Sequence, residues 1–160
     1  MITANRILDT VSVLGETMPE YHPDAADINE SLDHGVASCA VRAYAAGLLL
    51  RQEFPNENLY VINFGFAHDH GCDFVGENGV YDKMGHAVVG FWVPEKPRLV
   101  VETYTDSKFE VIPENDTHEG FVWMGLTEGY REYLARVGHD DIEVDPEEIL
   151  SFLNKLSTHA

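Results

Sequence analysis

Between Cys39 and Leu50 the chain carries a single charged residue, Arg42, among alanines, leucines and a tyrosine. Alanine and leucine favour the helix, and a helix that is apolar on nearly all sides must be buried rather than laid on a surface. Ser38 supplies an N-cap hydroxyl directly before this run. The sequence therefore predicts a buried central helix that begins at Cys39, and the rest of the chain has to pack around it.

The position of Cys39 allows two interpretations. A thiol at a helix N-terminus lies beside unpaired backbone N–H groups and the positive end of the helix dipole, and both favour the nucleophilic thiolate. Alternatively, Cys39 is a small apolar core residue, as many buried cysteines are. A base placed next to the thiol would favour the first interpretation.

A predicted β-hairpin supplies a candidate base and a candidate acid. The run from His86 to Val93 is apolar, β-branched and aromatic, which is typical of a strand. Residues 94–97 contain two prolines and predict a turn, and residues 98–104 predict a second, antiparallel strand. His86 then lies at the open end of the hairpin, and Glu102 lies on the returning strand.

Whether His86 and Glu102 meet depends on the hairpin register. If the loop has an odd length, such as residues 93–97, Val88 faces Glu102, and Glu102 shares a face of the sheet with His86. The two Cβ atoms are then diagonal neighbours, about 7–8 Å apart, within reach of a glutamate side chain. With an even loop, Glu102 would point to the opposite face.

These features resemble the core of the transglutaminase-like superfamily, relatives of the papain-like cysteine hydrolases. The resemblance rests on Gly-x-x-Ser-Cys ending at Cys39, on Gly-His-Ala around His86, and on an acidic residue followed by Thr103 about one hairpin later. It covers roughly residues 35–106. In that family a cysteine on a helix, a histidine on a strand and an acid on the next strand form a triad, which by position implies Cys39, His86 and Glu102.

The chain departs from the family pattern at three positions. The family usually has Asp where this chain has Glu102, commonly has Trp where it has Val88, and often has Pro where it has Thr103. Glutamate keeps the charge and adds one methylene group. Because the tryptophan is missing, the substrate class stays open, whereas the type of chemistry is less affected.

The resemblance implies a cysteine-dependent acyl-transfer enzyme that needs no cofactor. A thiolate would attack an amide or ester carbonyl and form a thioester, which water resolves in a peptidase or amidase and an amine resolves in a transferase. A peptide or protein would be the substrate. One oxyanion donor would be the Cys39 N–H; for the second, His34 and Asn29 are candidates, although local turn hydrogen bonds explain both residues equally well.

The charge balance of 10 basic and 28 acidic residues, a net charge of −18, predicts neither a nucleic acid nor a membrane partner. The excess of acidic residues is explained by solubility or a salty habitat, and alternatively by recognition of a basic substrate.

The chain has two cysteines, Cys39 and Cys72, and shows no leader-like start and no apolar run of about 18 residues. We expect a reduced, cytoplasmic protein, and a Cys39–Cys72 disulfide stays open. The sequence does not predict an oligomeric state.

A glycine-rich segment, residues 65–85, predicts a long loop that would act as a lid or a substrate-binding rim. Within it, alternation would place His68, His70 and Cys72 on one side, as zinc ligands lie. A closed site needs a fourth ligand, and no second paired motif occurs. The alternative function is therefore a non-catalytic binding or metal-binding module that uses this loop, with a polar loop tip as the plainer explanation. The third hypothesis is that the chain is a catalytically inactive member of the same fold.

At 160 residues, the chain is expected to form one domain, residues 1–160. The predicted class is α+β with a papain/transglutaminase-like core, in which the nucleophile-bearing helix is buried against a mostly antiparallel sheet of about five strands, with N- and C-terminal helices. Tyr130 and Tyr133 are expected to be packing aromatics. The remaining expected elements are a helix over 3–18 with Thr3 as N-cap, a solvated loop over 20–33 with at most one helical turn, strands over 59–64, 109–112 and 121–124, a helix from Thr127 to Gly138, and a last helix that begins at Asp145.

Overall fold

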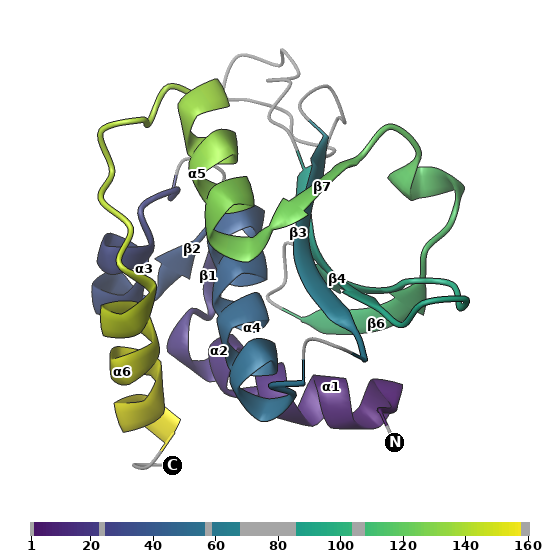
Figure 1. Cartoon of the computed structure of the whole chain (residues 1–160). Helices are drawn as coiled ribbons and strands as arrows, with labels where there is room; N and C mark the ends of the chain where they lie inside the picture. The colour runs from purple at the N-terminus through teal and green to yellow at the C-terminus, as the bar shows by residue number, and fades with distance from the viewer. Residues whose placement is uncertain (1, 23–24, 57–58, 68–85, 104–107, 158–160) are drawn as a thin grey trace.

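The computed structural model describes residues 2–22, 25–56, 59–67, 86–103 and 108–157 (Figure 1). Its main sheet has five antiparallel strands in the order β6-β5-β4-β3-β7. The strands are β3 (Val61–Ala67), β4 (His86–Trp92), β5 (Leu99–Thr103), β6 (Phe109–Pro113) and β7 (Val122–Gly125). The helices are α1 (Ala4–Val11), α2 (Val13–Thr17), α3 (Ile28–His34), α4 (Cys39–Glu53), α5 (Leu126–Arg136) and α6 (Pro146–Ser157), and a short parallel pair is formed by β1 (Glu20–Tyr21) and β2 (Val36–Ala37).

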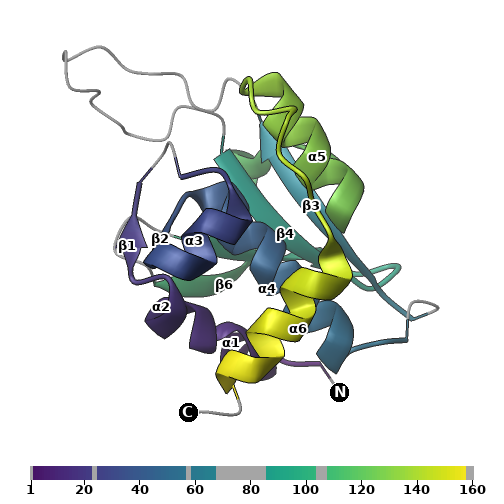
Figure 2. The same cartoon turned by 90° about the vertical axis from the view of Figure 1, so that its left-hand side faces the viewer.

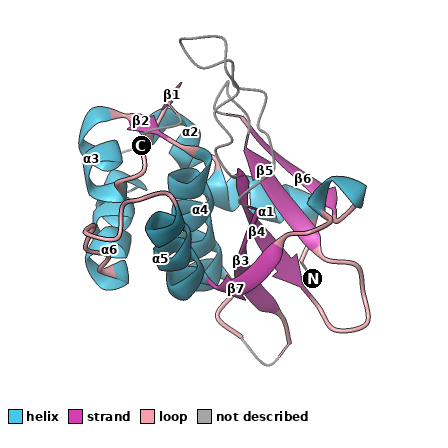
Figure 3. Cartoon of the chain, turned by 90° about the horizontal axis from the view of Figure 1, so that it is seen from above, coloured by secondary structure: helices cyan, strands magenta, loops and turns pink. Residues whose placement is uncertain are grey.

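The helices α3, α4, α5 and α6 gather on one side of the sheet, as the view from above shows (Figure 3). The predicted α+β class and the antiparallel sheet of about five strands are therefore confirmed. Within the described residues, no helix is both long and apolar enough to cross a lipid bilayer.

The central helix α4 begins at Cys39 and is buried from Cys39 to Leu50, as predicted. The Ser38 hydroxyl accepts from the Val41 N–H at 3.4 Å and caps its first turn. The single charge, Arg42, is fully buried. Its Nη2 donates to the carbonyls of Met18 (3.0 Å) and Glu20 (2.7 Å), which fixes the incoming chain against the helix.

A glycine lets α4 approach its neighbours closely. A Cβ added at Gly47 would lie 2.4 Å from Leu126 Cδ2 and 2.9 Å from Val89 Cγ2, so helix, sheet and α5 meet at this point. One turn earlier in α4, Tyr44 stacks on Tyr130 with ring centroids 4.5 Å apart. The prediction that Tyr130 is a packing aromatic is confirmed, and so is the same prediction for Tyr133, which is also buried.

The prediction that Thr127 caps α5 was wrong. Gly125 occupies the N-cap position, with no side-chain hydrogen bond to the helix. The Thr127 hydroxyl lies 2.9 Å from the Tyr44 hydroxyl and forms a hydrogen bond with it. A tertiary contact with α4 therefore replaces the local cap. At the last helix the prediction was right, because Asp145 Oδ1 accepts from the N–H groups of Glu147 and Glu148.

The N-terminal region differs from the single helix predicted over 3–18. Thr3 caps α1 as expected, but the helix is interrupted at Ser12, whose hydroxyl donates back to the Asp9 carbonyl at 2.9 Å. Such back-bonding by serine bends helices. The chain then continues as α2.

The solvated loop predicted over 20–33 was also wrong, because the region contains β1 and the seven-residue helix α3. Asp27 caps α3 by accepting from the Asn29 N–H at 3.0 Å, and Gly35 ends it with φ of 73°. The strand β1 then pairs in parallel with β2, which leads directly into α4 (Figure 2). These elements fix the start of α4 in space.

The face of the sheet turned away from α4 is covered in a different way. The connection between β6 and β7 crosses over it and contains a short 3-10 helix, Asp116–His118 (Figure 1). Trp123 lies flat on this face, where a Cβ at Gly65 or Gly90 would come within 2.4 or 2.5 Å of its ring. The guanidinium of Arg98 lies 4.0 Å from the centre of the Trp123 ring. Two glycines therefore make room for one aromatic ring.

Candidate active site

Cys39 lies at the N-terminal end of α4, where its position is set from both sides. The Ser38 N–H donates to the Ala25 carbonyl at 3.0 Å, and the Ser38 hydroxyl caps the helix. Among the described residues Cys39 forms no disulfide, and it is 3% exposed. The structure thus places a buried thiol at the positive end of the helix dipole.

The hairpin has the register that the pairing of His86 with Glu102 requires. The strands pair Val89 with Val101, and Phe91 with Leu99. The same register places residue 88 opposite residue 102, as predicted for a loop of odd length. Alternation along β4 then puts His86 on the face of Gly90, turned away from α4.

His86 and Glu102 form a short hydrogen bond, 2.6 Å between Nε2 and Oε1. Their side chains are 14% and 11% exposed, so water competes little for this contact. The imidazole also hydrogen-bonds with Cys39. Because Nε2 is engaged by Glu102, Nδ1 is the ring nitrogen left for the sulfur. The structure therefore brings together all three residues predicted for the triad.

Burial and hydrogen bonding act on this pair in opposite directions. Burial lowers the pKa of His86, but the hydrogen bonds and charges of Cys39 and Glu102 outweigh it and raise the pKa to about 10. For Glu102, burial raises the pKa, whereas hydrogen bonds and charges from His86 and His118 hold it below its usual value. The electrostatics favour an imidazolium next to a carboxylate.

His118 is a further member of the site, and it was not predicted from the sequence. Its Nε2 lies 2.9 Å from Glu102 Oε2, and the residue is 3% exposed at the end of the short 3-10 helix. Phe121 contacts both imidazoles edge-on, with centroids 6.1 Å from His86 and 5.4 Å from His118. No motif marks His118 in the sequence, because a lone histidine between polar residues is typical of a surface loop. Only the path of the chain after β6 brings it to Glu102.

The two proposed oxyanion donors have other surroundings. The Asn29 side-chain amide donates to the Glu143 carbonyl at 3.3 Å, which ties α3 to the segment before α6. His34 is exposed in the last turn of α3. The structure thus gives Asn29 a structural role, and the second donor has no assignment.

The predicted zinc ligands His68, His70 and Cys72 lie outside the described residues. Within the described part of the chain, no group of three or more histidine, cysteine, aspartate or glutamate residues could hold a metal ion. His86 and His118 contact different oxygens of Glu102, so this carboxylate bridges two rings through hydrogen bonds.

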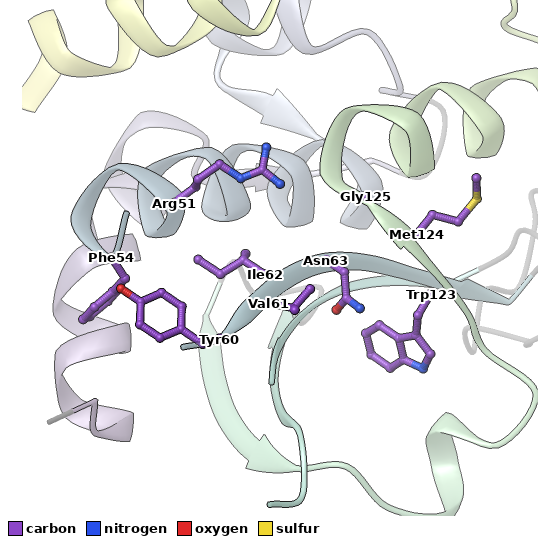
Figure 4. Close-up of a pocket in the computed structure, with 9 residues that line it drawn as sticks. All are labelled: Arg51, Phe54, Tyr60, Val61, Ile62, Asn63, Trp123, Met124 and Gly125. Atoms are coloured by element: carbon purple, nitrogen blue, oxygen red, sulfur yellow. The ribbon is translucent and has the colours of Figure 1, made fainter. Parts of the chain in front are cut away.

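A cavity of about 420 Å³ opens at the other end of the sheet, between the C-terminal half of α4 and the start of β3 (Figure 4). Its lining includes Arg51, Tyr60, Asn63 and Trp123. It contains neither Cys39 nor His86. The cavity therefore does not compete with the Cys39 site as the place of a nucleophilic reaction.

No family of known proteins, no curated protein and no solved structure matches this chain. The residues of the site and their geometry therefore carry the evidence for its chemistry.

Proposed function

We propose that the protein is a cysteine-dependent acyl-transfer enzyme of the transglutaminase-like superfamily, acting on a peptide or amide bond. The observation that supports this most is the position of one imidazole, His86, between the Cys39 thiol and the Glu102 carboxylate. A nucleophile, a base and a group that orients the base are the parts that such catalysis needs. They come from three separate elements of the fold.

In the proposed mechanism, Glu102 accepts from His86 Nε2–H and keeps Nδ1 turned to the sulfur. Cys39 attacks the substrate carbonyl as a thiolate, and the C–N bond breaks as His86 gives its Nδ1 proton to the leaving amine. Water then attacks the thioester, with His86 taking its proton, and the acid leaves as the thiolate–imidazolium pair returns. The N-terminal end of α4 faces the charge that develops on the carbonyl oxygen.

Hydrolysis of a peptide or protein substrate is the outcome that the family resemblance implies, and an amine in place of water would make the same site a transferase. The net charge of −18 favours an approaching basic substrate over an acidic one. A cytoplasmic location and a chemistry without a bound cofactor complete the proposal.

Thiol labelling tests the proposal directly. We expect iodoacetamide at pH 6.5 to label Cys39 at least about tenfold faster than Cys72, because an ordinary thiol ionises only near pH 8.5. The rates are measured by mass spectrometry of the two cysteine peptides. His86→Ala should remove the difference, while Cys72→Ser should leave the Cys39 rate unchanged.

Hydrolysis of a fluorogenic peptide library should follow the same pattern, with no turnover by Cys39→Ser. Equal, slow labelling of both thiols in the folded wild-type protein would contradict the proposed function. Labelling that is fast but independent of His86 would contradict the proposed role of this residue.

A further inference from the structure

Both oxygens of the Glu102 carboxylate are engaged by imidazoles. His86 Nε2 lies 2.6 Å from Oε1, and His118 Nε2 lies 2.9 Å from Oε2. The His118 side chain is 1% exposed, so water does not compete for this second contact. The proposed triad uses only the first oxygen, and the second contact has no role in it.

The direction of the second hydrogen bond follows from the backbone. The Asn115 N–H donates to His118 Nδ1 at 3.2 Å, so this nitrogen carries a lone pair. The ring proton of a neutral His118 must then be on Nε2, from which it donates to Glu102. A backbone amide, whose orientation is set by the fold, thus selects the tautomer.

The short helix that carries His118 is itself well supported. Asn115 Oδ1 accepts from both the N–H (2.8 Å) and the hydroxyl (2.6 Å) of Thr117, and with His118 it completes a capping box. Phe121 packs edge-on against the His118 ring. His118 therefore has little freedom to turn away from Glu102.

Glu102 needs such a donor because it is buried, and burial raises its pKa. The titratable groups that act on it are His86 from β4 and His118, with Cys39 behind His86. Glu110 lies directly across the β5–β6 pair and is exposed. Two N–H donors to the carboxylate offset the cost of its burial.

We propose that His118 is a positioning residue of the active site, which donates from Nε2 to Glu102 and holds the carboxylate ionised with Oε1 turned to His86. The consequence for catalysis rests on the proposed function, whereas the hydrogen bond itself does not. His118 acts through Glu102 and contacts neither the sulfur nor the substrate in this scheme.

Two variants distinguish the effect of the N–H donor of His118 from the effect of its ring. His118→Leu removes the donor, and His118→Gln keeps an amide N–H at a position close to that of Nε2. We expect His118→Leu to lower kcat about 10- to 100-fold, with KM little changed. The acid limb of the pH profile of Cys39 labelling by iodoacetamide should move up by about one to two pH units, because Glu102 then accepts a proton more readily.

His118→Gln should restore most of both properties, and His139→Leu, three residues beyond the end of α5, should behave as wild type. Equal profiles for wild type and a folded His118→Leu would overturn the proposal, and so would equal losses in the Leu and Gln variants. Fast wild-type labelling with an unchanged His118→Leu profile would leave the proposed function intact.

A measurement on the wild-type protein tests the hydrogen bond even if the His118 variants fail to fold. Long-range ¹H–¹⁵N spectra at neutral pH should show the proton of His118 on Nε2 and none on Nδ1. A proton on Nδ1 would overturn the proposal. This readout is independent of whether Cys39 reacts, so a failed labelling test would contradict the proposed function and not the hydrogen bond.

Discussion

The two faces of the main sheet are built in different ways. Toward α4, the strands present apolar side chains such as Phe64, Val89 and Phe91, all buried, and the helix opposite them is apolar on nearly every side. Toward the β6–β7 connection, the sheet presents Gly65 and Gly90 under the Trp123 ring, with the charged groups near the end of the sheet. One face supplies most of the core, and the other carries the acid–base network.

The candidate site lies where these two faces meet. Cys39 lies on the helix side, whereas His86, Glu102 and His118 lie on the other side, and Cys39 meets His86 at the start of β4. A nucleophile buried in an apolar core would have no base within reach, and a carboxylate there would lack donors. The face toward α4 thus stabilises the fold, and the opposite face holds the charged groups.

The largest expected effect tests the charged face alone. Glu102→Gln should lower kcat by about 10⁴-fold, because the imidazole loses the acceptor that fixes its tautomer. The matched control is Glu110→Gln, directly opposite on β6 but exposed, which should leave kcat within about twofold of wild type. Steady-state hydrolysis of the best library peptide measures both. Similar losses in the two variants would indicate an effect of the hairpin rather than of the acid.

A pair of glycine substitutions compares the faces through packing. At Gly65 a new Cβ meets the rigid Trp123 ring at 2.4 Å, whereas at Gly47 it meets the flexible end of Leu126. We expect Gly65→Ala to destabilise the protein by about 1–3 kcal/mol and Gly47→Ala by less, since alanine gains about 1 kcal/mol in helix propensity. Urea unfolding gives both values.

Only one of these substitutions should affect the site. Trp123 lies 6.1 Å from the Phe121 ring, which contacts both imidazoles. Gly65→Ala should therefore also slow Cys39 labelling, and Gly47→Ala should not. Equal labelling rates in the two folded variants would show that packing on the charged face is not coupled to the site.

A last comparison concerns the dependence of stability on pH. In the folded protein the pKa of His86 is raised from its ordinary value of 6.5 to about 10, so the folded state binds this proton more tightly. The resulting stabilisation is complete below about pH 6.5 and is lost as the pH rises to about 10. The difference in unfolding free energy between wild type and His86→Gln should decrease over that range. If this difference in unfolding free energy increased with pH instead, His86 would not be an imidazolium in the folded protein.

The sequence predicted the helix face well because its signals are local. A run with one charge from Cys39 to Leu50, capped by Ser38, has few ways to fold other than as a buried helix. The relation of His86 to Glu102 could also be predicted, since strand geometry converts a loop length into a choice of face. Both features depend only on residues that are neighbours in sequence or that belong to one hairpin.

Features that depend on tertiary contacts could not be predicted in this way. Thr127 has the composition of an N-cap, but its hydroxyl bonds Tyr44, which lies 83 positions earlier in the chain. The helix α3 lies in an acidic segment whose composition is typical of a loop. His118 reaches Glu102 only after the chain has formed β6 and crossed the sheet, and no spacing rule describes that crossing.

The turn that joins β4 to β5 lies at the far end of the hairpin from Cys39, yet its length decides on which side Glu102 emerges. Strand geometry has a parity: one residue added to or removed from this turn would invert the acid relative to the imidazole, while a change of two would restore it. Whether this remote, exposed turn has an odd or an even number of residues therefore determines whether Glu102 and His86 lie on the same face of the sheet. Changes in its length should be tolerated in steps of two.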